Sequence, residues 1–167
     1  MSAAIDVYVL DTSAWLTLIE DEAGADIVQE LLEKARAGEI VVLVSFMSFM
    51  EVYYITLQER DQSEARARVD LMAVLPVLRI DSTQTLGILA GALKASHRLS
   101  VADAWMAALA QARGATLVPK DPECEQVEAI MRVLKLPDKG HAVLANLFLG
   151  CSAGATSVQE GKEEGLL

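Results

Sequence analysis

The sequence lacks the residue patterns on which several common classes of protein depend. Among its 167 residues there are two cysteines, Cys124 and Cys151, and they form no Cys-x-x-Cys pair. Two cysteines of this kind make no disulfide framework. The glycine-rich patterns Gly-x-Gly-x-x-Gly and Gly-x-x-x-x-Gly-Lys-Ser/Thr are also absent, which argues against a nucleotide-binding enzyme.

Long apolar runs are lacking as well. The longest near-continuous one covers residues 40–50, whereas a membrane-spanning helix needs about 20 residues. The first residues contain no basic segment that leads into an apolar one, so we expect no secretory signal. Because 53% of the residues are hydrophobic and 23% are charged, we expect a soluble, cytoplasmic, globular protein.

Positive charge is scarce in this chain. It has 14 Lys and Arg residues against 24 Asp and Glu residues, which gives a formal net charge of −10. This balance argues against a protein that coats nucleic acid with basic side chains. It remains compatible with an enzyme that meets phosphates through a bound divalent cation, because carboxylates would then be ligands and the metal would supply the positive charge.

Short aliphatic runs alternate with longer helical patterns along the chain. We expect strands at residues 7–10, 41–45, 77–80, 115–118 and 132–136. We expect helices at about residues 16–19, 27–35, 46–60, 62–73, 83–96, 101–113 and 125–131. Strands separated by helices predict right-handed βα units and an α/β fold, with three α/β/α layers around a central, mostly parallel five-stranded sheet.

The composition changes near the C-terminus. Residues 1–137 carry the alternating pattern and are expected to form the domain. From residue 150 the sequence becomes small, polar and glycine-rich. We therefore expect residues 138–167 to form a C-terminal tail that is partly helical or disordered.

Four acidic residues occupy positions where a doubly wound sheet binds ligands, beyond the carboxyl ends of its strands. Asp11 directly follows the first strand, and Asp121 comes shortly after the fourth. Glu51 and Asp103 lie in apolar stretches of two helices, where an unpaired carboxylate is costly. If the first strand is central in the sheet, all four acids can converge on one crevice.

Three of these acids also have a purely structural interpretation. Asp11 can cap a helix, and Asp103 falls in a first helical turn, where the helix dipole favours negative charge. Asp121 can form a turn, with Pro122 starting the next helix. Glu51 has no such explanation, because it lies in the middle of a helix within an apolar run. The case for chemistry therefore depends on the four acids together.

The ordered set of four motifs resembles the PIN domain family. The matching segments are residues 9–14 (VLDTSA), 50–52 (MEV), 99–104 (LSVADA) and 116–123 (TLVPKDPE). The resemblance spans about residues 5–136, and the size is similar to that of the VapC-type toxins of prokaryotic toxin–antitoxin pairs. It implies a metal-dependent endoribonuclease that hydrolyses RNA phosphodiester bonds, with a cognate antitoxin protein and a homodimer as partners.

The resemblance also implies roles for individual residues. The acidic cluster that holds Mg²⁺ or Mn²⁺ and acts in catalysis would be Asp11, Glu51, Asp103 and Asp121. Ser13, or Thr12, would orient Asp11 or a metal-bound water by hydrogen bonding. Hard divalent cations prefer oxygen ligands, and a bound metal lowers the pKa of its water and neutralises charge on the scissile phosphate.

The sequence departs from the family pattern at the last acid. Pro119 stands two residues before Asp121, where Thr or Ser is common, and Cys124 stands where an aromatic residue usually follows. Glu123 is therefore a candidate to share or replace the role of Asp121. These departures support a second hypothesis, a catalytically weak or inactive PIN-like scaffold that binds a partner protein.

Two further assignments remain open. A phosphoacceptor signalling domain would use Asp81, at the end of the third strand, but it normally needs two adjacent acids after the first strand, where Asp11 stands alone. Arg98, Arg113 and Lys120 lie near the proposed crevice. There they either meet an RNA backbone or remain solvated surface charges.

Overall fold

The strand β1 (Asp6–Leu10) is one of the two inner strands of the sheet, and it ends in the buried residues Val9 and Leu10. The computed structural model describes residues 5–138. In it, β1 (Asp6–Leu10) pairs in parallel with β2 (Ile40–Ser45) on one side and with β4 (Thr116–Val118) on the other. β3 (Leu78–Ile80) adds to β2, so the order is β3-β2-β1-β4. The first strand therefore lies between the second and the fourth, which is the condition under which the four acids can converge.

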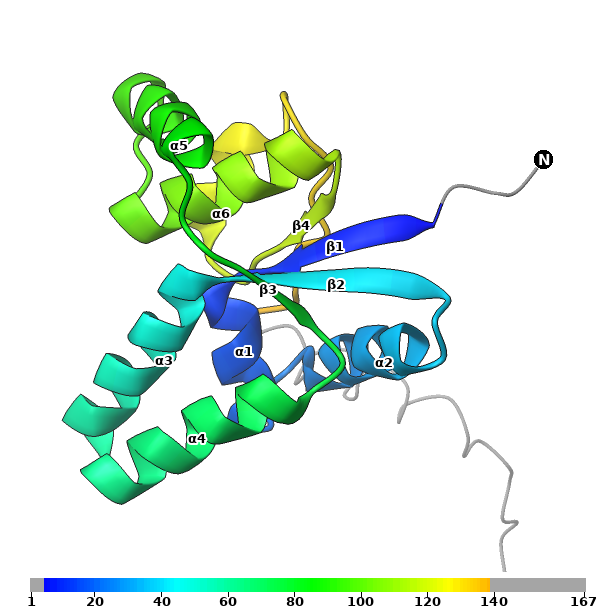
Figure 1. Ribbon diagram of the computed structural model, residues 1–167, viewed down its shortest axis with the longest axis vertical. Helices are drawn as coiled ribbons and strands as arrows, with labels where there is room; N and C mark the ends of the chain where they lie inside the picture. Colours follow the sequence, from blue (N-terminus) through cyan, green and yellow to red (C-terminus); the bar gives the residue numbers. More distant parts are fainter. Residues whose placement is uncertain (1–4, 139–167) are drawn as a thin grey trace, which may run out of the picture.

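Helices cover both faces of this sheet, as the sequence predicts. The helices are α1 (Thr12–Ile19), α2 (Ala25–Arg36), α3 (Phe46–Glu59), α4 (Gln62–Val74), α5 (Gln84–Ser96) and α6 (Val101–Arg113). Figure 1 shows α1 to α4 below the sheet, with α5 and α6 above it. Successive side chains of a strand point to opposite faces of the sheet. Val9 therefore packs into the core between the sheet and α5 and α6, whereas Leu10 packs into the core between the sheet and α1 to α4.

The expected fifth strand at residues 132–136 is not formed as a strand. This segment runs beside β4 and makes one isolated parallel bridge, between Leu117 and Val133. The amides of Leu134 and Leu136 donate to the carbonyls of Leu117 and Pro119 at 2.8 Å. β4 is only three residues long, and Pro119 has no N–H to offer, so the ladder does not extend beyond it. The described sheet therefore has four strands.

The short helix expected at residues 125–131 begins earlier and is a 3-10 helix, η1 (Pro122–Val127). The side chain of Asp121 caps it by accepting from the amide of Glu123 at 2.9 Å. Pro122 has the fixed φ of a first helical residue. The cap and the proline fix the start of η1 at Pro122. The spacing of the apolar residues alone predicts a start three residues later.

Predictions for residues 139–167, including the C-terminal tail, lie outside the described residues. Within residues 5–138, no helix is both long enough and apolar enough to cross a bilayer.

Gly24 is the position where the fold needs glycine. It has φ +96°, and a Cβ there would lie 2.9 Å from Cδ of Pro137. We predict that Gly24→Ala lowers the free energy of unfolding by about 1–3 kcal/mol, because it adds both backbone strain and a clash. In the matched control Gly91→Ala, the new Cβ meets nothing within 4 Å inside α5. It should raise stability by up to ~1 kcal/mol. Urea unfolding measures both, and equal effects would contradict this account.

Candidate functional site

Asp11 is a buried carboxylate at the junction of β1 and α1, with 3% of its surface exposed. Its Oδ2 accepts from the amide of Ser13 at 2.9 Å and from the Ser13 hydroxyl. Burial raises the pKa of Asp11 from 3.8 to about 6, although the Ser13 hydroxyl works in the opposite direction. The charges of Asp103 and Glu51 raise this pKa further, so the three acids lie close enough to influence one another.

Glu51 is positioned by the start of α1. It lies half-buried on α3, and its Oε2 accepts from the hydroxyl of Thr12 at 2.5 Å. The same Thr12 hydroxyl lies 3.1 Å from Oγ of the buried Ser48. The pKa of Glu51 is raised, first by burial and also by the charge of Asp103, while the hydrogen bond from Thr12 lowers it. Thr12 therefore orients Glu51, and Ser13 orients Asp11.

Asp103 belongs to a capping box at the start of α6. Its amide donates to Oγ of Ser100 at 3.0 Å, and the amide of Ser100 donates to Oδ2 of Asp103 at 3.3 Å. Ser100 is the N-cap and Gly114 the C-cap of α6, so the helix has the bounds 101–113 that the sequence predicts. The capping box holds the Asp103 carboxylate at the N-terminus of α6. From there its charge raises the pKa of both Asp11 and Glu51.

The last acids lie on the segment that follows β4. Asp121 and Glu123 are both exposed, at the start of η1, while the neighbouring Cys124 is buried. Burial raises the pKa of the Cys124 thiol strongly, and the charges of Asp11, Asp103, Asp121 and Glu123 raise it further. Cys124 thus stays protonated at neutral pH and is a packing residue among the acids.

The four acids share one feature of hydrogen bonding. In each, one carboxylate oxygen accepts from a neighbour, and the other accepts no hydrogen bond from any described residue. The accepting atoms are Oδ2 of Asp11, Oε2 of Glu51, Oδ2 of Asp103 and Oδ1 of Asp121. Between residues 5 and 138, however, no three His, Cys, Asp or Glu side chains are grouped tightly enough to hold a metal ion. Asp11, Glu51 and Asp103 influence one another electrostatically, but the described residues form no closed ligand set.

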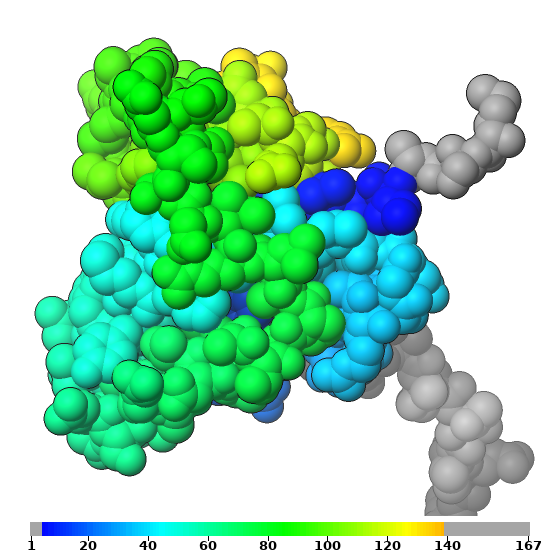
Figure 2. Space-filling model, viewed as in Figure 1, coloured from blue at the N-terminus to red at the C-terminus, as the bar shows by residue number. Residues whose placement is uncertain are grey.

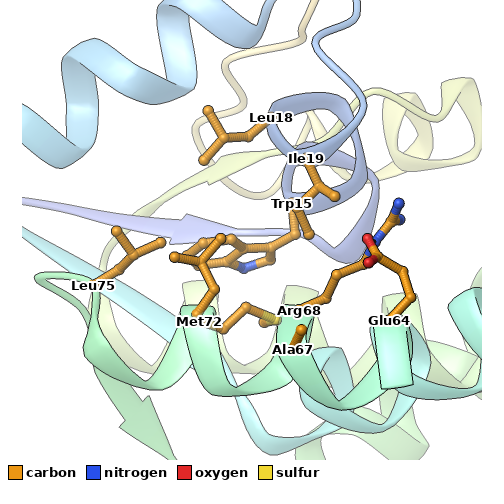
Figure 3. Close-up of a pocket in the computed structure, with 9 residues that line it drawn as sticks. Trp15, Leu18, Ile19, Glu64, Ala67, Arg68, Met72 and Leu75 are labelled. Atoms are coloured by element: carbon orange, nitrogen blue, oxygen red, sulfur yellow. The ribbon is translucent and has the colours of Figure 1, made fainter. Parts of the chain in front are cut away.

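A separate apolar pocket of about 340 Å³ lies between α1 and α4 (Figure 3). The indole of Trp15 forms its base, and Leu18, Met72 and Leu75 line its walls. The one cation that lines it, Arg68, is already paired with Glu64 at 2.8 Å and with Glu20 at 2.5 Å. This pocket offers shape and apolar surface but no charged group that is free for chemistry, so the acids remain the better candidate site.

The acids come from elements that meet at one edge of the sheet. α1 begins directly after β1, α3 begins directly after β2, and η1 follows β4. In Figure 2 the outline of the molecule is indented on the left, where α6 (yellow-green) meets α3 (cyan). Asp103 is in the first turn of α6 and Glu51 is in the second turn of α3. Asp11, at the end of β1, and Asp121, at the start of η1, belong to this same edge of the sheet.

A comparison with family models decides the classification. The model described as the PIN domain matches residues 8–130, which is most of the chain. The chain belongs to the PIN domain family. Its similarity to known structures agrees with this assignment.

Several solved toxin–antitoxin structures share the fold. The VapBC2 complex of Rickettsia felis, bound to a promoter DNA fragment, has 17% identity and a TM-score of 0.63, covering 78% of this chain and 99% of that one. A DNA-bound VapBC of Salmonella typhimurium has 17% identity and a TM-score of 0.62, covering 79% and 98%. The VapC20 toxin of Mycobacterium tuberculosis, described as cleaving the sarcin–ricin loop, has 18% identity and a TM-score of 0.58, covering 74% and 95%. No curated protein matches.

Sequence reasoning missed the residues that support the acids. Ser48 was one polar residue in an apolar run, and nothing marked it as the neighbour of Thr12. Lys120 was considered as a contact for RNA or as a solvated charge. In the structure its ammonium lies 2.6 Å from Oε2 of Glu22. Thr12 and Ser48 are 36 residues apart and Lys120 and Glu22 are 98 apart, so no local sequence pattern indicates either contact.

The raised pKa of Asp11 predicts a pH-dependent stability. Because the folded pKa of about 6 exceeds the ordinary value of 3.8, the folded state binds this proton more tightly. The resulting stability is complete below about pH 4 and is lost as the pH rises through 6. In metal-free buffer, Asp11→Asn should therefore be more stable than wild type at pH 7, by up to ~3 kcal/mol.

Urea unfolding of both proteins from pH 4 to 7.5 tests this prediction. The difference between the two proteins reports the titration of Asp11 together with its coupling to Glu51 and Asp103. The advantage of Asp11→Asn should shrink as the pH falls towards 4. A difference that does not change with pH would contradict it.

Proposed function

We propose that this protein is a metal-dependent endoribonuclease, the toxin of a toxin–antitoxin pair, that hydrolyses RNA phosphodiester bonds. Asp11, Glu51, Asp103 and Asp121 are its proposed catalytic and metal-holding residues. The observation that carries the proposal is their hydrogen bonding: each carboxylate is held by one oxygen, while the other accepts from no described residue. Membership of the PIN domain family supports it.

The donor set fits a hard divalent cation. All four groups offer carboxylate oxygens, which Mg²⁺ and Mn²⁺ prefer, and Mg²⁺ keeps several waters rather than needing a complete protein cage. Burial and neighbouring negative charges raise the pKa of Asp11 and Glu51. A cation relieves this repulsion. The absence of a tight ligand group between residues 5 and 138 is compatible with such an open site.

Each supporting residue then has a defined task. When bound, the metal would lower the pKa of a water and neutralise charge on the scissile phosphate. Ser13 and Thr12 fix the orientation of Asp11 and Glu51 through their hydroxyls. Ser100 holds Asp103 through its amide. Glu123 is exposed beside Asp121 and is available to share its role.

The proposed partners are an RNA substrate, an antitoxin protein and a second copy of this chain, acting in the cytoplasm. Structures of VapBC complexes with the same fold support a protein partner. The acids indicate which residues the partner would use. A Lys or Arg side chain placed among them would lower the raised pKa of Asp11 and exclude a metal. An antitoxin of this kind would therefore cover the acidic site.

Two alternatives compete with this proposal. A non-catalytic scaffold is favoured by Pro119 and Cys124, which stand where the family pattern has other residues. A phosphoacceptor role for Asp81 has less support, because this exposed carboxylate is paired with Nε of Arg79 at 2.9 Å and the chain is a PIN domain.

Calorimetric titration with Mn²⁺ and thermal unfolding with Mg²⁺ or Mn²⁺ test the function. We predict that metal at about 100 times its dissociation constant stabilises wild type by about 2.7 kcal/mol. The metal should also support cleavage of a generic single-stranded RNA. Asp103→Asn should lose both effects, since it keeps the capping shape but loses a charge. Asp81→Asn, an exposed acid outside the site, should behave as wild type.

Two results would distinguish the alternatives. Metal binding without RNA cleavage would support a scaffold that has kept the metal site but lost the chemistry. Wild type that neither binds Mn²⁺ nor cleaves RNA, and that is matched by Asp103→Asn, would contradict the proposed nuclease.

A further inference from the structure

Lys120 is a cation within an acidic region, and its side chain is turned away from solvent. Its Nζ lies 2.6 Å from Oε2 of Glu22 and 3.4 Å from the carbonyl oxygen of Ala23. The Lys120 side chain is 14% exposed and that of Glu22 is 23% exposed. A lysine held in this way is neither a solvated surface charge nor free to contact RNA. It joins the segment after β4 to the loop between α1 and α2.

The backbone of Lys120 makes a second connection. Its amide donates to Oγ of Ser13 at 2.9 Å, and the Ser13 hydroxyl in turn donates to Asp11. The next residue in the chain is Asp121. Lys120 thus connects two acids of the candidate site. Its amide is linked to Asp11 through Ser13, and its peptide bond leads directly to Asp121.

Both ends of this connection are anchored by packing. Pro119 is buried and its carbonyl accepts from the amide of Leu136 at 2.8 Å. The loop that carries Glu22 continues into Gly24, which lies against Pro137 so closely that a Cβ would clash at 2.9 Å. The ion pair therefore ties Lys120, which lies just beyond the anchored Pro119, to a loop that is itself anchored at Gly24.

The burial of this pair decides its importance. Exposed pairs contribute little, because water competes for both charges. Here both side chains are largely buried, so replacing the lysine by an apolar residue removes an ion pair that is shielded from water and joins the two segments. The segment would then be expected to shift towards solvent. Asp121 is exposed and accepts hydrogen bonds from the amides of Glu123 and Cys124 within the same segment, so it would move with that segment.

We propose that Lys120 is a positioning residue: through Glu22 and Ser13 it holds the segment that carries Asp121 beside Asp11. The inference rests on the proposed function, since Asp121 is a metal-holding residue only there. Loss of the ion pair should weaken divalent binding although all four acids remain. Outer residues that orient metal ligands typically change metal affinity by about 10- to 100-fold.

The test compares Lys120→Met, Lys120→Arg and Lys34→Met. The Met variant keeps the aliphatic length and removes the charge, and Arg restores it. Lys34→Met removes an exposed ion pair on α2, with Glu30, far from the acids in the sequence. Calorimetry with Mn²⁺ gives affinity, and exchange of the amide hydrogens of residues 120, 121, 123 and 124 in metal-free buffer gives the order of the segment. Thermal unfolding shows that each variant is folded.

We expect Lys120→Met to bind Mn²⁺ about 10-fold more weakly or worse, with faster exchange in this segment. Lys120→Arg should recover most of both properties, and Lys34→Met should match wild type. If Lys120→Met does not fold, Glu22→Gln removes the charge from the other side and should show the same two changes. A Lys120→Met protein with wild-type affinity and exchange overturns the inference and leaves the proposed function intact.

The two proposals fail in different ways. Wild type that binds no Mn²⁺ contradicts the proposed function. The exchange measurement in metal-free buffer then still decides whether Lys120 orders the segment.

Discussion

The burial of one carboxylate at the end of the central strand constrains the whole site. Asp11 is almost inaccessible, and burial raises its pKa to about 6. A buried charge must be compensated by hydrogen bonds or by a counter-ion. Ser13 supplies the hydrogen bonds, and Lys120 donates its amide to the same hydroxyl. Because β1 lies between β2 and β4, the other acid-bearing segments begin beside it.

Helix capping and chemistry are compatible roles for the same carboxylate. Asp11 caps α1, Asp121 caps η1, and Asp103 is part of a capping box. Each of these roles uses one carboxylate oxygen. The second oxygen accepts no hydrogen bond from the described residues, and in the proposed function it is the atom that would bind the cation. The caps therefore fix the direction of the acids without occupying them, which is how preorganised ligands are positioned.

Local signals made much of the fold predictable. The helix expected at residues 101–113 is α6 with the same bounds, and the alternation of aliphatic runs with helical patterns predicted a parallel sheet. The order of the motifs predicted the PIN family, which the family model confirms. Long-range features were not predictable, because the pairing of Lys120 with Glu22 depends on how distant loops pack. The missing fifth strand has a local cause instead, because Pro119 has no N–H with which to continue the ladder.

The central claim is that a divalent cation relieves the repulsion around Asp11. The most direct measurement is the pKa of the Asp11 carboxyl, followed by carbon-13 NMR through a pH titration with and without saturating Mg²⁺. The account predicts a pKa near 6 without metal, and a pKa well below that when Mg²⁺ is present, because the cation favours the ionised form. A pKa that Mg²⁺ leaves unchanged would contradict it.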